Sequence, residues 1–378
     1  KKATSGSYGI GGTAIKGAPA EGSVIEDCYI YGGAGGGSYP GTCIEISGVT
    51  NLVLKNCVLS SGTAADYCVQ RDQNYGSVLW FKEKNTGIIT LDNCTLKKNN
   101  PFAITKAVIT GNFGAGSKFK VIGNMTVYAM GEPLITTENL SSISTTWLNA
   151  NGEEGALVAR GDGTFYVPVP VAQIGDDKYY SLSEAVEGAK SGDTITMIGD
   201  VKLLMNAGVD IPADKSIVID LNGHRIEGYA ATGTTSYVIQ NRGILTITDS
   251  SADKSGQIVS YATSPDLNPV PGYASNTILN YGHLTINGAF VESKGEGYAS
   301  FAVDNDAENA QWRKTVDREV KLTLINGAKL RSNTSVTVRM YLDTEGDYNN
   351  VIDINGADMG SLWVQDNAGA TAAKGSLT

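Results

Sequence analysis

A short apolar segment with a turn in its middle recurs along the chain and constrains the fold more than any other feature. It reads LDNCTL at residues 91–96, INGAFV at 286–291, LINGAKL at 324–330 and INGADM at 354–359. Weaker copies occur at residues 25–30, 54–59, 122–127 and 221–226. Recurrence of one unit at intervals of 29 to 39 residues is typical of a solenoid, in which each unit stacks on the next.

The residues around each copy alternate between apolar and polar. Thr285, for example, lies between Leu284 and Ile286. A period of two is typical of a strand with one buried face. Asn-x-Gly triplets at 241–243 and 280–282 supply residues that tolerate left-handed backbone angles, so a sharp turn is expected there. Strand, tight turn, strand and loop, repeated, predict an all-β parallel β-helix.

One position of the recurring segment is small in most copies. It is occupied by Cys28, Cys57, Cys94, Ala289, Ala328 and Ala357, with Met125 and His224 as exceptions. Coils of a β-helix stack about 4.8 Å apart, so these side chains should form a ladder inside the wall. We expect the cysteines there to be buried free thiols, because in-register side chains point alongside each other. Cys43 and Cys68 are candidates for a second, shorter ladder.

The middle of the chain predicts a division into two segments. Residues 166–171 carry two prolines, which resist both helix and central strand. A helix is expected at 181–190, with Ser181 as its cap and Glu184 completing a capping box. We therefore expect residues 1–170 to be the C-terminal part of a first β-helix with its end cap and linker. Residues 171–378 should form a second β-helix, whose open end the helix covers.

The start of the second segment resembles pectin-lyase-like right-handed β-helix domains. The resemblance lies in YSLSEAV at 180–186, GDTITMIGDV at 192–201, IVIDLNGHRI at 217–226, GILTITDS at 243–250 and the later INGA copies. Such domains occur in tandem in large secreted and surface-anchored adhesin-like proteins of Gram-positive gut bacteria. The resemblance covers residues 171–363 well, and the first half only in its coil pattern. It implies a right-handed β-helix, an extracellular location and neighbouring domains in a longer parent chain. A longer parent chain is also consistent with the first β-helix, which is expected to begin without a cap.

Many right-handed β-helices are polysaccharide lyases or glycoside hydrolases, so acidic and basic clusters matter. Pectinase-type hydrolysis needs paired carboxylates on one wall. The polygalacturonase signatures Asn-Thr-Asp and Gly-His-Gly are absent, and no Cys-x-x-Cys pair predicts a zinc site. His224 occupies the small position and is interpreted as structural, while His283 is expected to face solvent. The sequence thus predicts no catalytic, metal-binding or cofactor-binding residue.

The segment 303–318 interrupts the repeat and is the predicted contact surface. Its carboxylates, aromatic ring and cation suit carbohydrate or peptide contact, because rings stack on apolar sugar faces while polar groups bond hydroxyls. The candidate ligand-binding residues are Asp304, Asp306, Glu308, Trp312 and Arg313. Their spacing also resembles a calcium loop, but Asn309 replaces the turn glycine and Thr315 the closing glutamate. A merely solvated loop is the other interpretation. A second interruption, at 341–348, is expected beside it.

Charge and hydropathy exclude some function classes. The net charge is −10, which disfavours binding to nucleic acid or anionic membranes. No apolar run reaches the roughly 18 residues of a membrane span. We expect a non-catalytic extracellular module of a bacterial surface protein, a stalk or adhesin without cofactor, whose partners are host or dietary glycans or a surface protein. The alternative is a polysaccharide lyase or glycoside hydrolase with an unrecognised active site.

Overall fold

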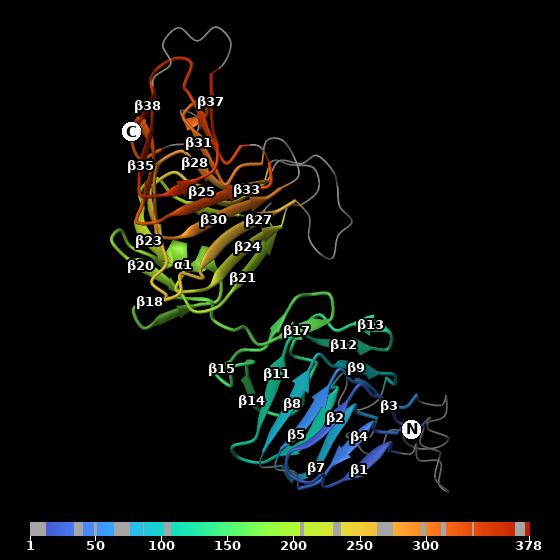
Figure 1. The fold of residues 1–378 in the computed structure, drawn as a ribbon. Coiled ribbons are helices and arrows are strands. Elements are labelled where there is room, and N and C mark those ends of the chain that lie inside the picture. The colour runs from blue at the N-terminus through green and yellow to red at the C-terminus, as the bar shows by residue number, and fades with distance from the viewer. Residues whose placement is uncertain are drawn as a thin grey trace, which may run out of the picture. The chain divides into compact units, whose positions relative to one another are not determined.

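The chain forms two compact units, Lys1–Val169 and Pro170–Thr378 (Figure 1). The computed structural model describes residues 13–33, 41–48, 51–63, 76–85, 87–101, 107–204, 208–229, 236–262, 275–295, 300–310, 315–334, 336–366 and 375–378. Within these residues the chain is almost entirely β, with one short α-helix. The all-β class predicted from the repeated segments is therefore confirmed.

Unit 1 contains three sheets, which we number 1 to 3. Sheet 1 has the order β1 (Ile15–Gly17), β4 (Ile44–Ile46), β7 (Leu79–Asn85), β10 (Ile109–Phe113). Sheet 2 has the order β15 (Glu154–Gly155), β14 (Thr146–Leu148), β11 (Lys118–Ile122), β8 (Ile88–Asp92), β5 (Leu52–Lys55), β2 (Ser23–Glu26). Sheet 3 has the order β16 (Val158–Ala159), β17 (Thr164–Tyr166), β12 (Met125–Ala129), β9 (Thr95–Lys98), β6 (Val58–Ser60), β3 (Tyr29–Tyr31), with β13 (Glu132–Pro133) paired to β12.

Unit 2 contains sheets 4 to 6. Sheet 4 has the order β19 (Asp177–Tyr179), β18 (Ala172–Ile174), β20 (Thr194–Met197), β23 (Ser216–Asp220), β26 (Ile244–Thr248), β29 (His283–Asn287), β32 (Glu319–Ile325), β35 (Asn349–Asn355), β38 (Gly375–Leu377). Sheet 5 has the order β21 (Val201–Leu204), β24 (Arg225–Tyr229), β27 (Gln257–Tyr261), β30 (Phe290–Lys294), β33 (Lys329–Ser332), β36 (Asp358–Met359). Sheet 6 has the order β22 (Val209–Ile211), β25 (Ser236–Asn241), β28 (Ser275–Asn280), β31 (Val303–Asp306), β34 (Val338–Tyr341), β37 (Leu362–Gln365).

Consecutive strands take the three sheets of a unit in rotation. In unit 2, β20, β21 and β22 belong to sheets 4, 5 and 6, and this order repeats up to β37. Each of these strands pairs in parallel with the strand three positions later, and the register aligns equivalent residues. Ile247 is the partner of Ile286, for example, and Ile286 is the partner of Leu324. These three side chains point inward and are fully buried, as the period-two pattern predicted.

The cysteine ladder of unit 1 forms in the predicted register. Thr95 N donates to the Cys57 carbonyl and Thr126 N to the Cys94 carbonyl, so successive copies stack. Cys57 and Cys94 are each 1% exposed and carry free thiols. Cys28 is a free thiol too, but it is exposed, which corrects the expectation that all three would be buried. It lies before β3, the outermost described strand of sheet 3, and no described strand precedes β3 in that sheet. Cys68 lies outside the described residues.

The bend before each small residue has left-handed backbone angles. Asp27, Asn56 and Asn93 have φ values of 53°, 50° and 49°, and Gly288 and Gly356 both have 69°. Asn, Asp and Gly adopt this conformation at the lowest cost, which explains their recurrence there. The turn in the middle of the recurring segment is therefore confirmed.

The Asn-x-Gly triplets work differently from the prediction. Neither Asn241 nor Gly243, and neither Asn280 nor Gly282, has a positive φ. The glycines are needed for space, since a Cβ on Gly282 would lie 2.3 Å from the carbonyl oxygen of Gly243. The asparagines are needed for their side chains, which are fully buried. The turn was predicted correctly, but not its physical reason.

One helix, α1 (Leu182–Gly188), begins unit 2 where a helix at 181–190 was predicted. Ser181 is its N-cap, and Ser181 Oγ accepts a hydrogen bond from Glu184 N at 3.1 Å. The reciprocal bond of the box goes from Tyr180 N to Glu184 Oε2 at 3.2 Å, one residue before the cap. Leu182, Ala185 and Val186 are buried in the core of unit 2. The hairpin β18–β19 pairs antiparallel with β20 and so covers the first edge of sheet 4.

Candidate functional site

The predicted ligand-binding residues Asp304 and Asp306 lie on β31 of sheet 6, and both are buried. Val303 and Asn305, which alternate with them, point to the interior, so the two aspartates lie on the outer face. Other side chains cover them there, because their exposed fractions are only 1% and 2%. Neither carboxylate is open to a ligand approaching from solvent.

Arg339, on the next strand of sheet 6, neutralises this pair. Its Nε and Nη2 donate to Oδ1 and Oδ2 of Asp304 at 2.7 and 2.5 Å, and Nη2 lies 3.8 Å from Oδ2 of Asp306. Asn276 donates to Asp304 at 3.1 Å, and Asn309 donates twice to Asp306 at 2.9 Å. Burial raises the pKa of the Asp304 carboxyl to about 6, although Arg339 opposes this shift. A bidentate pair with this many donors is a structural ion pair.

Glu308, the third predicted carboxylate, joins the two interruptions of the repeat. Its Oε2 accepts from Thr344 N at 2.8 Å, and its Oε1 accepts from Thr344 Oγ1 at 3.2 Å. Ala307 N donates to the carbonyl oxygen of Tyr341 at 2.9 Å. The segment 341–348 therefore lies beside the end of β31, as predicted. A small apolar cluster packs outside the main core here and comprises Leu279, Tyr281, Ala307, Ala310 and Val320.

Two of the predicted contact residues, Trp312 and Arg313, lie outside the described residues. The three carboxylates that accompany them in the sequence are brought together, but by hydrogen bonds that serve the fold. Asp304 thus links neighbouring strands of sheet 6, while Asp306 and Glu308 hold the segments that follow β31 and β34.

A second candidate surface, which the sequence did not single out, is the outer face of sheet 5. Tyr229 and Tyr261, the last residues of β24 and β27, stack with ring centroids 5.1 Å apart and planes inclined by 10°. Lys294 follows them in register on β30, and its Nζ lies 5.5 Å from the Tyr261 ring. Stacked rings beside a cation form a rigid array at one edge of this face.

Glu227 lies next to the rings, also on the outer side of β24. Its Oε2 accepts a hydrogen bond from Tyr229 Oη at 2.8 Å, and its Oε1 lies 3.1 Å from Nη2 of Arg225. Lys202 Nζ lies 3.7 Å from Oε2. Burial and the hydrogen bond to Glu227 raise the pKa of Tyr229 to about 12, so its hydroxyl stays protonated.

Glu292, two strands further along sheet 5, has a similar set of partners. Gln257 Nε2 donates to its Oε2 at 2.7 Å, and Lys294 Nζ lies 3.3 Å from the same oxygen. Arg225 Nη2 donates to Tyr261 Oη at 3.2 Å, which links the two networks. We call this surface the tyrosine face, comprising Arg225, Glu227, Tyr229, Gln257, Tyr261, Glu292 and Lys294. Glu227 and Tyr229 are buried, so the members that solvent reaches are Arg225, Gln257, Tyr261, Glu292 and Lys294, which supply both charges, a hydroxyl and an amide.

The two histidines pair with carboxylates of two separate connections, one before β21 and one before β32. His224 Nδ1 lies 3.3 Å from Asp200 Oδ1, and His283 Nε2 lies 3.2 Å from Asp317 Oδ1. The side chain of His224 is 32% exposed, so it is not packed in the wall as its ladder position had led us to expect. Its ring is directed to Asp200, whereas Ala289, at the equivalent position of a later copy, is buried.

Clusters suited to a metal ion are not found in the described part of the chain. No three His, Cys, Asp or Glu side chains converge there so as to hold one. Among the same residues, no helix has the length and apolar character needed to cross a membrane.

Comparison with known proteins identifies no relative: no family model, no curated protein and no solved structure matches the chain. Function therefore has to be inferred from the fold and from the two surfaces described above.

Proposed function

We propose that this chain is a non-catalytic extracellular module of a bacterial surface protein, built from two right-handed parallel β-helices and serving as a stalk or adhesin. The observation that carries the proposal is the rotation of consecutive strands through three sheets in register (Figure 1). This is the connectivity of a chain that coils around one axis. Right-handedness is supported by the rule that parallel crossover connections have this hand in about 98% of cases.

Continuous pairing suits a spacer. Within the described part of unit 2, β20 is followed in sheet 4 by six further parallel strands, and sheets 5 and 6 have six strands each. Because each coil is bonded to its neighbours along three sheets, bending or extension has to break backbone hydrogen bonds in several places at once. Such a module keeps a ligand-binding surface in a fixed position.

The tyrosine face is the surface we propose for glycan contact. Sugars are recognised by aromatic rings together with carboxylates, amides and cations that bond hydroxyl groups. Tyr261 and Gln257 on β27, with Glu292 and Lys294 on β30, supply these groups, and their mutual bonds fix them before a ligand arrives. A pre-ordered array loses little conformational entropy on binding.

The alternative, a polysaccharide-degrading enzyme, has one observation in its favour. Glu227 and Glu292 both lie on the tyrosine face, and Val259 separates them in the register. Two strand spacings place their Cα atoms about 10 Å apart. Inverting glycosidases hold their two carboxyl groups about 6.5–9.5 Å apart. Each glutamate has cationic partners, which favours a structural role, but the pair defines where hydrolysis would occur.

The test is incubation with immobilised pectins, host glycans and mucin, followed by measurement of bound protein and of released products. We expect retention on at least one glycan without unsaturated sugars or new reducing ends. Lys294→Glu should lower retention about tenfold, whereas Lys190→Glu, an exposed site outside the tyrosine face, should not.

Two results would overturn parts of this proposal. Products that disappear in Glu227→Gln or Glu292→Gln would establish the enzyme instead. Equal retention of Lys294→Glu and wild-type protein would remove the tyrosine face from glycan binding.

A further inference from the structure

The first edge of sheet 5 is open, in contrast to the corresponding edge of sheet 4. Sheet 4 continues past β20 into the antiparallel hairpin β18–β19. Sheet 5 begins at β21, and no other described strand pairs with β21 on the side away from β24. Helix α1 packs against β18, β19 and β22. Its main contacts are therefore with sheets 4 and 6, and its first residues also line the space beside β21.

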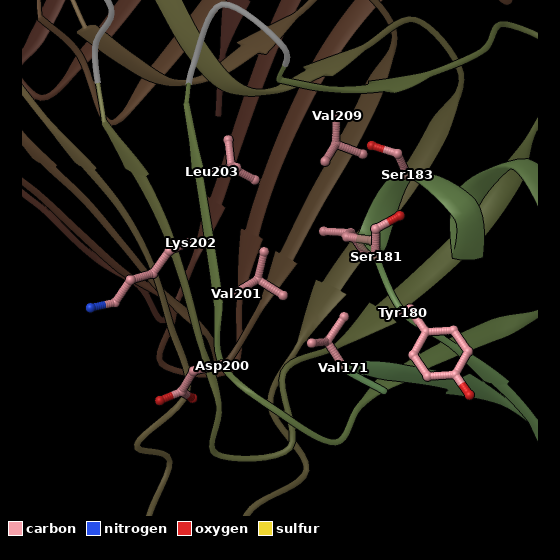
Figure 2. A pocket seen from close by; sticks show the side chains of 10 residues that line it. Val171, Tyr180, Ser181, Ser183, Asp200, Val201, Lys202, Leu203 and Val209 are labelled. Atoms are coloured by element: carbon pink, nitrogen blue, oxygen red, sulfur yellow. The ribbon is translucent and has the colours of Figure 1, made fainter. Parts of the chain in front are cut away.

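A groove of about 310 Å³ lies beside this edge (Figure 2). Its lining residues come from β21, from the start of α1 and from the segments around β18 and β22. They are Val171, Tyr180, Ser181, Leu182, Ser183, Asp200, Val201, Lys202, Leu203 and Val209. Val201 and Leu203 are only partly buried, although both pack against the core of unit 2. The groove is thus an uncovered part of the apolar interior.

The side chains of β21 alternate about this edge. Figure 2 shows Val201 and Leu203 pointing into the groove and Lys202 pointing away from it. Lys202 lies on the outer face, with a side chain that is 71% exposed, and its Nζ is 3.7 Å from Oε2 of Glu227. Glu227 already has Arg225 and Tyr229 as closer partners. The ammonium of Lys202 therefore remains available to a second carboxylate.

We propose that the β21 edge binds an extended peptide segment of a partner protein, which adds to sheet 5 as a further strand. Apolar side chains at alternate positions of that segment fill the groove above Val201 and Leu203. An acidic side chain between them lies on the outer face beside Lys202. Backbone pairing gives such strand addition its affinity, and pockets for alternate side chains give it specificity.

The requirement for a strand follows from three properties of the edge. Unpaired backbone groups of an edge strand are a template for another chain. Residues two apart in a strand point to the same side, as Val201 and Leu203 do. An acidic residue between the two apolar residues of the partner segment would lie beside Lys202, which carries the opposite charge. A compact apolar molecule would occupy the groove without using the edge or the charge.

The binding experiment uses the full chain and a fluorescein-labelled peptide, acetyl-Thr-Val-Glu-Val-Thr-amide. We expect a saturable rise in fluorescence anisotropy and slower amide exchange at β21. The same peptide methylated on the central backbone nitrogen should bind about five- to tenfold more weakly, because it lacks a strand-pairing donor. A single valine amide should not compete at equal concentration.

A charge swap tests the orientation. Lys202→Glu should weaken the Val-Glu-Val peptide roughly fivefold and strengthen a Val-Lys-Val peptide by a similar factor. Lys329→Glu, at an exposed position on β33 of the same sheet, is the matched control and should change neither affinity. Both sites are exposed, so circular dichroism should show unchanged folds.

Each outcome decides for or against strand addition. Reciprocal preference together with protection of β21 supports it. Equal binding of the methylated peptide, competition by valine amide, or no binding at millimolar peptide would each overturn it. Lys294→Glu, which tests glycan retention, lies on β30, three strands from β21 in sheet 5, so failure of one proposal is distinguishable from failure of the other.

Discussion

Asn280 Nδ2 donates a hydrogen bond to Asn305 Oδ1 at 2.5 Å, and both side chains are fully buried in unit 2. The bond is one rung of a ladder, because Asn241 donates to Asn280 at 2.8 Å and Asn305 donates to Asn350 at 2.7 Å. The same amides also bond turn carbonyls, such as that of Gly282. Four successive coils are thus joined inside the turn between sheets 6 and 4.

Asn280→Ala should lower the unfolding free energy of unit 2 by about 3 kcal/mol, because it leaves buried donors and acceptors of the ladder unpaired. Denaturant unfolding followed by Trp363 fluorescence measures this change. Asn287→Ala removes an exposed asparagine pair with Asn326, 2.7 Å long, and is the matched control. Its cost should be well under 1 kcal/mol. If both substitutions lowered the unfolding free energy equally, the buried ladder would not stabilise unit 2 more than the exposed asparagine pair does.

Arg339→Met should destabilise unit 2 by about 3–5 kcal/mol, because Asp304 and Asp306 would be left buried without their cation. The double variant Arg339→Met with Asp304→Asn should recover part of the loss, since it removes one of the two stranded charges. Arg331→Met, which breaks an exposed pair with Asp358, should have little effect. Urea unfolding of wild type, Arg339→Met, Asp304→Asn and the double variant yields the coupling energy. If the double variant were no more stable than Arg339→Met, the loss would come from the packing of the Arg339 side chain and not from its charge.

The repeated segments were sufficient to predict the strands, the parallel stacking and the ladder of Cys57 and Cys94. Those features depend on periodicity within a short window of sequence, which a single chain reveals directly. The capping of α1 was also predictable, because Ser181 and Glu184 are three residues apart.

The surfaces were less predictable, because they depend on register between strands that are far apart in sequence. Asp304 was predicted to contact ligand, and the partner that buries it, Arg339, follows 35 residues later. Tyr229 and Tyr261 stack only because β24 and β27 align, and connections of unequal length hide that alignment in the sequence. Residues in the wall are therefore readable from the sequence, whereas pairs across its outer face are not.

The cysteines of unit 1 should differ sharply in reactivity. Burial raises the pKa of Cys43 to about 12 and that of Cys94 to about 11, so few thiolates form at neutral pH. Cys28 is exposed and should react first with iodoacetamide at pH 7.5. Peptide mass mapping of a Cys68→Ser variant should find Cys28 modified within minutes, and Cys43, Cys57 and Cys94 only after unfolding. Early modification of Cys94 would contradict the buried ladder.

Lys98, on β9, should make the stability of unit 1 depend on alkaline pH. Its side chain is 2% exposed, and no hydrogen bond or ion pair to its Nζ occurs within the described residues. Burial lowers its pKa from 10.5 to about 8. The unfolded chain therefore holds this proton up to a higher pH than the folded one. The contribution of Lys98 to stability is complete above pH 10.5 and is lost as the pH falls through 8.

Lys98→Met should remove this dependence. At pH 7 the variant should be more stable than wild type by about 3 kcal/mol, because the cost of burying an ammonium disappears. The difference should shrink as the pH rises from 8 to 10.5. Buried thiols with raised pKa values, such as Cys94, act in the opposite sense, so the difference between the two proteins is the quantity to measure. Guanidinium unfolding monitored by Trp147 fluorescence at several pH values provides it. If the stability difference between the two proteins stayed constant across this range, the pKa of Lys98 would be the same in the folded and unfolded states.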